Sequence, residues 1–254
     1  MISLFMNSLF RVICLVLLLF FPDTALSEII VHDTVAPKGQ ESMLTVETKG
    51  RLFREGGELV EFFVDGKSLG KSLSGGDGFA FKHFVPSRAG IYRITVKSKK
   101  EEGQGLLLSL RKGDGILFVD VEGSLFEGGF SETPKKGSQE TIKKLSGRFQ
   151  LIFLQTGALS IKAVKVWLKK NGFTDLPVIP WENGMIFDEI KEHGFKIKVV
   201  IGSGPVVESA KAYHPKAISF DEVEGAEEVK SWEEIGRRLK QARNLTYPGS
   251  KRNN

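Results

Sequence analysis

Cysteine is nearly absent from this chain of 254 residues, which contains only Cys14. Cys14 lies in an apolar run near the N-terminus, so the sequence beyond that run has no thiol. This excludes disulfides, cysteine-ligated metal sites and a thiolate nucleophile from the rest of the chain. The folded part must therefore be stabilised by ordinary hydrophobic cores.

The apolar run itself predicts export. Residues 12–21 are apolar, follow Arg11 and lead to a small-x-small pattern at residues 25–27. This order is typical of a secretory signal peptide, so we expect residues 1–27 to be removed and the mature chain to be periplasmic or secreted. The alternative is a retained membrane anchor, which would hold Arg11 inside the bilayer at a cost of about 2.5–3.5 kcal/mol.

Aromatic residues are missing from the basic segments. The formal charge is +5, and lysines cluster at residues 97–100, 135–136, 143–144 and 169–170. Single-stranded nucleic acid is bound by basic grooves that carry aromatic stacking platforms, so we expect no nucleic-acid partner. Lysines on solvated faces are the simpler interpretation, while an anionic surface stays open as a partner. Residues 244–254 are expected to form a basic, flexible tail.

Helical periodicity is lacking between residues 28 and 112. Short alternating runs separated by glycines include strand patterns at residues 44–46 and 92–96 and two strands joined at Asp65-Gly66. An Asp-Gly pair between alternating runs is a strong hairpin signal. The pattern predicts a β-sandwich over residues 28–112.

Three motifs of this segment resemble those of bacterial immunoglobulin-like domains. They read Phe-Val-Asp-Gly at residues 63–66, Gly-Asp-Gly-Phe-Ala-Phe at residues 76–81 and Ala-Gly-Ile-Tyr-Arg-Ile at residues 89–94. The resemblance implies an immunoglobulin-like domain that acts as a spacer or adhesion module. Such a fold identifies no ligand by itself.

In the second half of the chain, strand and helix patterns alternate. Apolar strand patterns stand at residues 116–119, 151–154 and 198–201, and Ser160 is placed to cap a helix after the second of them. The alternation predicts an α/β domain over residues 113–243, with a parallel sheet and crossover helices.

An acidic motif follows the first of these strands. Residues 120–124 read Asp-Val-Glu-Gly-Ser, which places two carboxylates where parallel sheets bind ligands. The segment resembles the first motif, Asp-x-Asp-Gly-Thr, of phosphatases of the haloacid dehalogenase-like (HAD) superfamily. A strand that merely ends in a polar turn is the alternative interpretation.

The HAD resemblance implies a role for each residue of the motif. It implies that Asp120 attacks phosphorus, that Glu122 acts as general acid and base, and that Thr156, after the next strand, binds phosphate. It also implies a Mg²⁺ ion held by Asp120 and by the backbone carbonyl of Glu122. Thr156 could instead cap the chain locally.

Two later positions depart from the pattern of that family. Ser203 stands where the family has a metal-binding Asp, and Asn183 or Gly184 stands near the position of its lysine. Phosphoryl transfer depends on positioning and charge neutralisation, so both losses weaken the expected catalysis. Glu208 or the acids at residues 221–222 are candidate replacements, although solvated acids explain them more simply.

A cap domain is not expected either. Only residues 125–134 separate the first motif from the next helical pattern. In the HAD superfamily, capless members have open sites and tend to act on proteins or lipid head groups. A sandwich followed by a HAD domain is also similar in layout to the lipin-type phosphatidate phosphatases.

The sequence therefore predicts an immunoglobulin-like β-sandwich followed by a capless, HAD-like α/β domain of Rossmann type. The first functional hypothesis is an exported, Mg²⁺-dependent phosphomonoester hydrolase with an altered site, acting on a large or lipid-linked phosphorylated substrate. The second is a catalytically inactive binding or scaffold protein of the cell envelope. The sequence indicates neither the substrate nor the oligomeric state.

Overall fold

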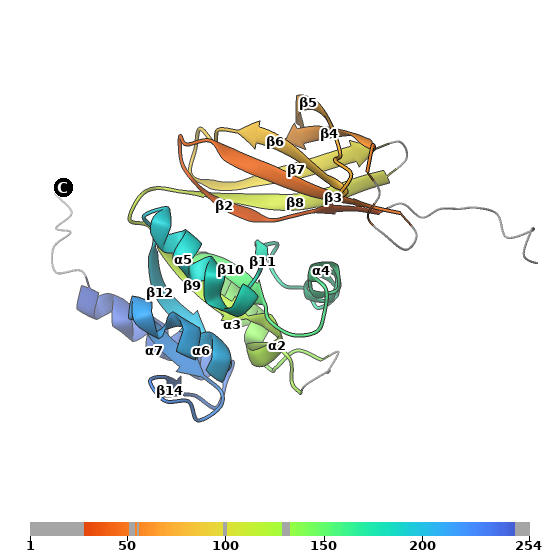
Figure 1. Cartoon of the computed structure of the whole chain (residues 1–254). Coiled ribbons are helices and arrows are strands. Elements are labelled where there is room, and N and C mark those ends of the chain that lie inside the picture. Colours follow the sequence, from red (N-terminus) through yellow and green to blue (C-terminus); the bar gives the residue numbers. More distant parts are fainter. Residues whose placement is uncertain (1–27, 51–53, 55, 99–100, 129–132, 247–254) are drawn as a thin grey trace, which may run out of the picture.

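The computed structural model describes residues 28–50, 54, 56–98, 101–128 and 133–246 (Figure 1). The expected signal peptide lies outside these residues. A sandwich of two sheets is followed by a parallel sheet with helices on both faces. The predicted β-sandwich and parallel α/β sheet are thereby confirmed, while membership of the HAD superfamily stays a prediction. No helix among the described residues is long and apolar enough to cross a membrane.

Eight strands form the sandwich: β1 (Glu28–Val31), β2 (Thr34–Pro37), β3 (Ser42–Lys49), β4 (Leu59–Val64), β5 (Lys67–Leu73), β6 (Phe79–Phe84), β7 (Gly90–Ser98) and β8 (Glu101–Leu110). One sheet has the order β1-β3-β6, with antiparallel neighbours. The other has the order β2-β8-β7-β4-β5, in which only β2 and β8 run parallel. Both sheets contribute apolar side chains to one core, in which Val46, Phe62 and Leu107 are fully buried.

The predicted Asp-Gly turn joins β4 to β5. Asp65 and Gly66 have φ angles of 48° and 81°, which glycine and, less readily, aspartate can adopt. Val64 and Lys67 are paired directly across the turn. The local turn chemistry therefore fixes the register of this hairpin.

Six strands form the parallel sheet: β9 (Gly115–Asp120), β10 (Gln150–Gln155), β11 (Val178–Pro180), β12 (Lys196–Ile201), β13 (Lys216–Ser219) and β14 (Glu227–Glu228). Their order is β11-β10-β9-β12-β13-β14, and every neighbouring pair is parallel. Counted within this domain the order is 3-2-1-4-5-6, the doubly wound Rossmann order. The chain thus turns from one side of β9 to the other between β11 and β12.

The helices of this domain are α2 (Val121–Ser124), α3 (Ser138–Ser146), α4 (Ile161–Lys170), α5 (Met185–Glu192), α6 (Gly204–Ala210) and α7 (Trp232–Thr246), with short 3₁₀ turns η1 (Glu182–Gly184) and η2 (Lys211–Tyr213). Side chains of α3, α4 and α7 share one core with the sheet, and side chains of α5 and α6 share another. The Ser160 hydroxyl accepts from the Ala163 amide at 3.2 Å, as its predicted cap position requires. Helix α7 reaches Thr246 and so includes the first three residues of the predicted tail. The remaining tail residues, 247–254, lie outside the described chain.

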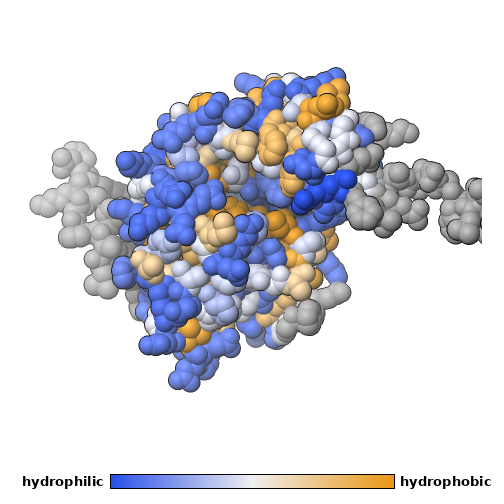
Figure 2. All heavy atoms as spheres, viewed as in Figure 1, coloured by the Kyte–Doolittle hydropathy of each residue, from blue (hydrophilic) through white to orange (hydrophobic). Residues whose placement is uncertain are grey.

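The two domains share a contact zone, which we call the seam. The core beneath α5 and α6 also contains Val35 of β2 and Leu108 and Leu110 of β8, each at most 2% exposed. Figure 2 shows hydrophobic atoms along this seam on an otherwise largely hydrophilic face. The predicted boundary at residues 112–113 falls in the turn between β8 and β9. The seam is therefore a packed interface.

Asp33 provides the polar centre of the seam. It follows β1, and its side chain is 1% exposed. Its carboxylate accepts from the Leu106 amide (2.8 Å), the Val178 amide (2.8 Å) and the Lys165 ammonium (2.6 Å). Lys165 lies on α4 and Val178 begins β11, so one aspartate of the sandwich binds two elements of the α/β domain.

Candidate functional site

The sequence-predicted site residues meet at the carboxyl edge of the parallel sheet. Asp120 ends β9, Thr156 follows β10 and Ser203 comes two residues after β12. β10 and β12 flank β9 on opposite sides. Ligands of doubly wound sheets bind at this switch point, which makes it the leading candidate for a functional site. We refer to Asp120, Glu122, Gly123, Thr156 and Ser203 as the Asp120 cluster.

Asp120 is fully enclosed, with an exposed fraction of 0%. Its Oδ1 accepts from the Thr156 hydroxyl (2.5 Å) and the Gly123 amide (2.9 Å). Its Oδ2 accepts from the Ser203 hydroxyl (2.7 Å) and amide (3.1 Å). A carboxylate offers about four acceptor positions, so hydrogen bonds within the protein use them all. An attacking carboxylate needs one oxygen open to its substrate, and Asp120 has none in this conformation.

Glu122 and Thr156 form the second half of the cluster. Glu122 Oε2 accepts from the Thr156 amide at 2.9 Å and lies 3.3 Å from the Thr156 hydroxyl. That hydroxyl has a single proton, and its shorter contact is to Asp120. Glu122 Oε1 is buried without a hydrogen-bond partner among the described residues. Thr156 therefore bridges the two carboxylates, and its hydroxyl is not directed toward open space.

Glycines allow this close approach. A Cβ atom on Gly123 would lie 2.3 Å from Asp120 Oδ2, and one on Gly157 would lie 2.8 Å from Glu122 Oε1. Both distances are shorter than real contacts of a Cβ atom. Gly123, the glycine of the Asp-x-Glu-Gly motif, thus makes room for the Asp120 carboxylate, a role that the motif alone did not indicate.

The cluster does not fit a Mg²⁺ ion. Mg²⁺ requires near-octahedral oxygen ligands at about 2.0–2.1 Å, usually with one or two carboxylates. Both oxygens of Asp120 already accept two hydrogen bonds each, and Ser203 contributes a hydroxyl where an acid would be needed. Among the described residues, no group of three or more His, Cys, Asp or Glu side chains could hold a metal.

The candidate replacements have other surroundings. Glu208 forms an ion pair with Lys211 at 2.5 Å, one turn further along the chain. The amide of Asp221 donates to Ser219 Oγ, and both residues 221 and 222 are exposed. At the predicted lysine position, a Cβ atom on Gly184 would lie 2.7 Å from the Ser209 Cβ, so this backbone packs against α6. A compensating acid or lysine is therefore not evident in these positions.

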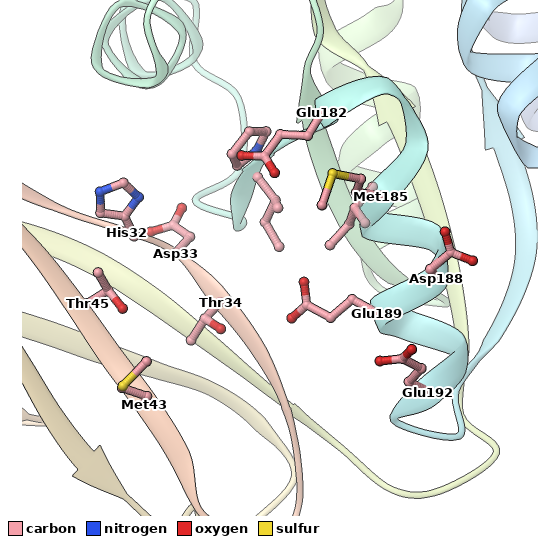
Figure 3. A pocket seen from close by; sticks show the side chains of 13 residues that line it. His32, Asp33, Thr34, Met43, Thr45, Glu182, Met185, Asp188, Glu189 and Glu192 are labelled. Atoms are coloured by element: carbon pink, nitrogen blue, oxygen red, sulfur yellow. The ribbon is translucent and has the colours of Figure 1, made fainter.

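Apart from the Asp120 cluster, a cleft lies at the seam, between the sandwich and α5 (Figure 3). This cleft has a volume of about 460 Å³. Figure 3 shows His32 and Met43 on the sandwich wall facing Met185 and Glu189 of the α5 wall. Carboxylates, threonines and apolar side chains complete the lining: Asp33, Thr34, Thr45, Ile179, Pro180, Glu182, Ile186, Asp188 and Glu192.

Electrostatics distinguish the walls of this cleft. Burial lowers the pKa of His32, against the attraction of Glu47, so its ring is neutral near pH 7. Burial raises the pKa of Glu189, although His193 opposes the shift and Glu182 adds to it. The combination of carboxylates with apolar side chains suits groups that are both cationic and apolar. Sequence reasoning missed this cleft because its walls come from residues more than 100 positions apart, as the Asp33–Lys165 contact across the same seam illustrates with a separation of 132.

Comparisons with known proteins assign no family. No protein-family model matches the chain, and no characterised protein matches its sequence. The CARDB domain of PF1109 from Pyrococcus furiosus is similar at 12% identity and a TM-score of 0.27, covering 33% of this chain and 94% of that one. Fibronectin(III)-like modules of Clostridium thermocellum CbhA are similar at 12% identity and a TM-score of 0.27, covering 34% of this chain and 48% of that one. The D0-D1 domain of intimin is similar at 18% identity and a TM-score of 0.27, covering 32% of this chain and 46% of that one. The chain thus spans less than half of the latter two, and at these TM-scores the likeness carries no functional information.

Proposed function

We propose that this chain is an exported, catalytically inactive scaffold or binding protein, in which a HAD-like domain keeps its fold and has lost its chemistry. The observation that carries the proposal is the enclosure of Asp120, which is 0% exposed and accepts four hydrogen bonds. A nucleophile needs a free oxygen within about 3–3.5 Å of the reacting atom. Here protein groups occupy those positions.

The charge balance of the cluster supports the same proposal. Phosphoryl transfer needs cations that neutralise the developing charge. The Asp120 cluster has two carboxylates and three uncharged residues, and within the described part of the chain neither carboxylate accepts a hydrogen bond from a lysine or arginine side chain. An incoming phosphate would therefore meet two negative charges without compensation.

The packed seam supports a structural role. Apolar residues of both domains share a core there, and Asp33 binds elements of the α/β domain directly. Such an interface holds the two domains in one relative orientation, as a scaffold requires. The signal-peptide pattern of residues 1–27 supports a place for this scaffold in the cell envelope or outside the cell.

Hydrolysis of a generic phosphomonoester tests the proposal. The mature chain and its Asp120→Asn variant are assayed side by side, with Mg²⁺ and with EDTA, to control for contaminating phosphatase. We expect equal, background rates for both proteins. A rate for the natural chain at least tenfold above that of Asp120→Asn would establish the competing hypothesis, a phosphomonoester hydrolase that uses Asp120.

A further inference from the structure

We infer that Ser203 replaces a divalent cation in the Asp120 cluster, so that this site assembles without metal. The inference rests on the proposed function, because it takes the α/β domain as HAD-like. It goes further by naming the group that holds the edge of the sheet together. Ser203 joins β12 to β9, and Thr156 joins β10 to β9, both through Asp120.

The hydroxyl of Ser203 is diverted from the role its position favours. Ser203 is the N-cap residue of α6, with φ −69° and ψ 166°, yet its side chain makes no capping hydrogen bond. A serine at an N-cap normally accepts from an amide of the first helical turn, as Ser160 does at α4. Ser203 instead donates to Asp120 Oδ2 at 2.7 Å. Its proton therefore supplies positive partial charge where a cation would supply a full charge.

Close packing and hydrogen bonding both disfavour an ion beside Asp120 while Ser203 is in place. Gly123 lies so close that a Cβ atom there would be 2.3 Å from Asp120 Oδ2 and 2.9 Å from the Ser203 Cβ. A cation that bound Asp120 would also have to displace the amides of Gly123 or Ser203 from its oxygens. A displaced amide would stay buried without a partner, which disfavours the exchange.

The test is thermal unfolding of the mature chain in EDTA and in 10 mM Mg²⁺. For the natural chain we expect the same midpoint in both, because a ligand that does not bind the native state cannot stabilise it. Ser203→Asp should unfold at a lower temperature than the natural chain in EDTA, because two carboxylates then face each other, and Mg²⁺ should raise its midpoint. Ser203→Ala is the matched control, and it should be destabilised equally in both solutions.

Titration with Mn²⁺, followed by its electron paramagnetic resonance, supplies a second measurement should Ser203→Asp not fold. We expect the natural chain and Asp120→Asn to leave equal amounts of free Mn²⁺. A Mg²⁺-dependent midpoint of the natural chain, or Mn²⁺ binding that Asp120→Asn abolishes, would overturn the inference. Phosphatase activity that persists in EDTA would refute the proposed function and still support a metal-free cluster, so the two failures are distinguishable.

Discussion

Removal of the Asp33 carboxylate should destabilise the whole chain. In Asp33→Ala the amides of Leu106 and Val178 lose their acceptor, and both residues are at most 5% exposed. A buried, unpaired amide costs about 1–3 kcal/mol. Lys165 also loses its partner, but its side chain is 26% exposed and can reach water. We therefore expect a loss of about 3–4 kcal/mol, in line with the removal of one partner from a buried ion pair.

The seam offers a matched control for this variant. Arg93 and Asp175 also join the two domains, at 2.7 Å, but their side chains are 68% and 61% exposed. Exposed pairs contribute about 0–1 kcal/mol, so Asp175→Ala should change stability little. The difference in stability between Asp33→Ala and Asp175→Ala therefore separates the effect of burial from that of an ion pair across the seam.

Urea unfolding followed by two probes measures both effects. The three tryptophans, Trp167, Trp181 and Trp232, lie in the α/β domain, so their fluorescence reports on that domain. Far-ultraviolet circular dichroism reports on the chain as a whole. The natural chain should give coincident transitions, because the domains share a core. A loss in Asp33→Ala within about 0.5 kcal/mol of that in Asp175→Ala would refute the reasoning, since the difference would then lie within the accuracy of additive estimates.

The titration of Asp33 adds a pH dependence. Burial raises the pKa of Asp33 above its ordinary 3.8, although Lys165 opposes the shift. The folded state then binds the Asp33 proton more tightly than the unfolded state does. Protonation of Asp33 therefore adds to the free energy of unfolding, in full below pH 3.8, and this stabilisation is lost as the pH rises through the pKa of the folded state. Asp33→Asn should lack this decline when the free energy of unfolding is measured from pH 4 to 7.

Three further outcomes follow from single residues. Gly123→Ala should lower the free energy of unfolding by roughly 2 kcal/mol or more in the same urea assay, because its Cβ would clash with the Asp120 carboxylate. Gly128→Ala is the control and should be nearly neutral, because no atom lies within 4 Å of the position of its Cβ. Burial lowers the pKa of His32, so stability should fall as the pH drops from 6.5 toward that pKa, and His32→Asn should flatten this part of the curve. The hydrogen bond to Asp188 raises the pKa of Tyr213 to about 12. In Asp188→Asn the pKa of Tyr213 should move toward its ordinary value of 10.0, as measured by the ultraviolet absorbance of the phenolate. An unchanged pKa would contradict the contact between Tyr213 and Asp188.

The sequence predicted those parts of the molecule that local patterns determine. Apolar runs located β9, β10 and β12, and a turn signal located the hairpin at Asp65 and Gly66. The position of Asp120, Thr156 and Ser203 on neighbouring strand ends follows from the parallel order. The catalytic roles that the HAD resemblance implies for Asp120, Glu122 and Thr156 stay predictions.

Contacts between distant segments were not predictable in the same way. Asp33 and Lys165 are 132 residues apart, and neither belongs to a motif. The diverted hydroxyl of Ser203 depends on where the helix after β12 begins relative to β9, which no periodicity encodes. Helix α7 extends to Thr246, beyond residue 243, where the α/β domain was predicted to end.

The shared core beneath α5 and α6 has a consequence for any attempt to divide the protein. Val35, Leu108 and Leu110 would face water in a sandwich expressed alone, at a cost of about 1.5–3 kcal/mol for each fully uncovered side chain. The matching face of the α/β half would be uncovered too, leaving an apolar patch of the kind that drives aggregation. Cleavage after residue 112 should thus yield two aggregation-prone fragments that become soluble only when mixed. Recovery of solubility on mixing would then report that the two fragments have reassembled.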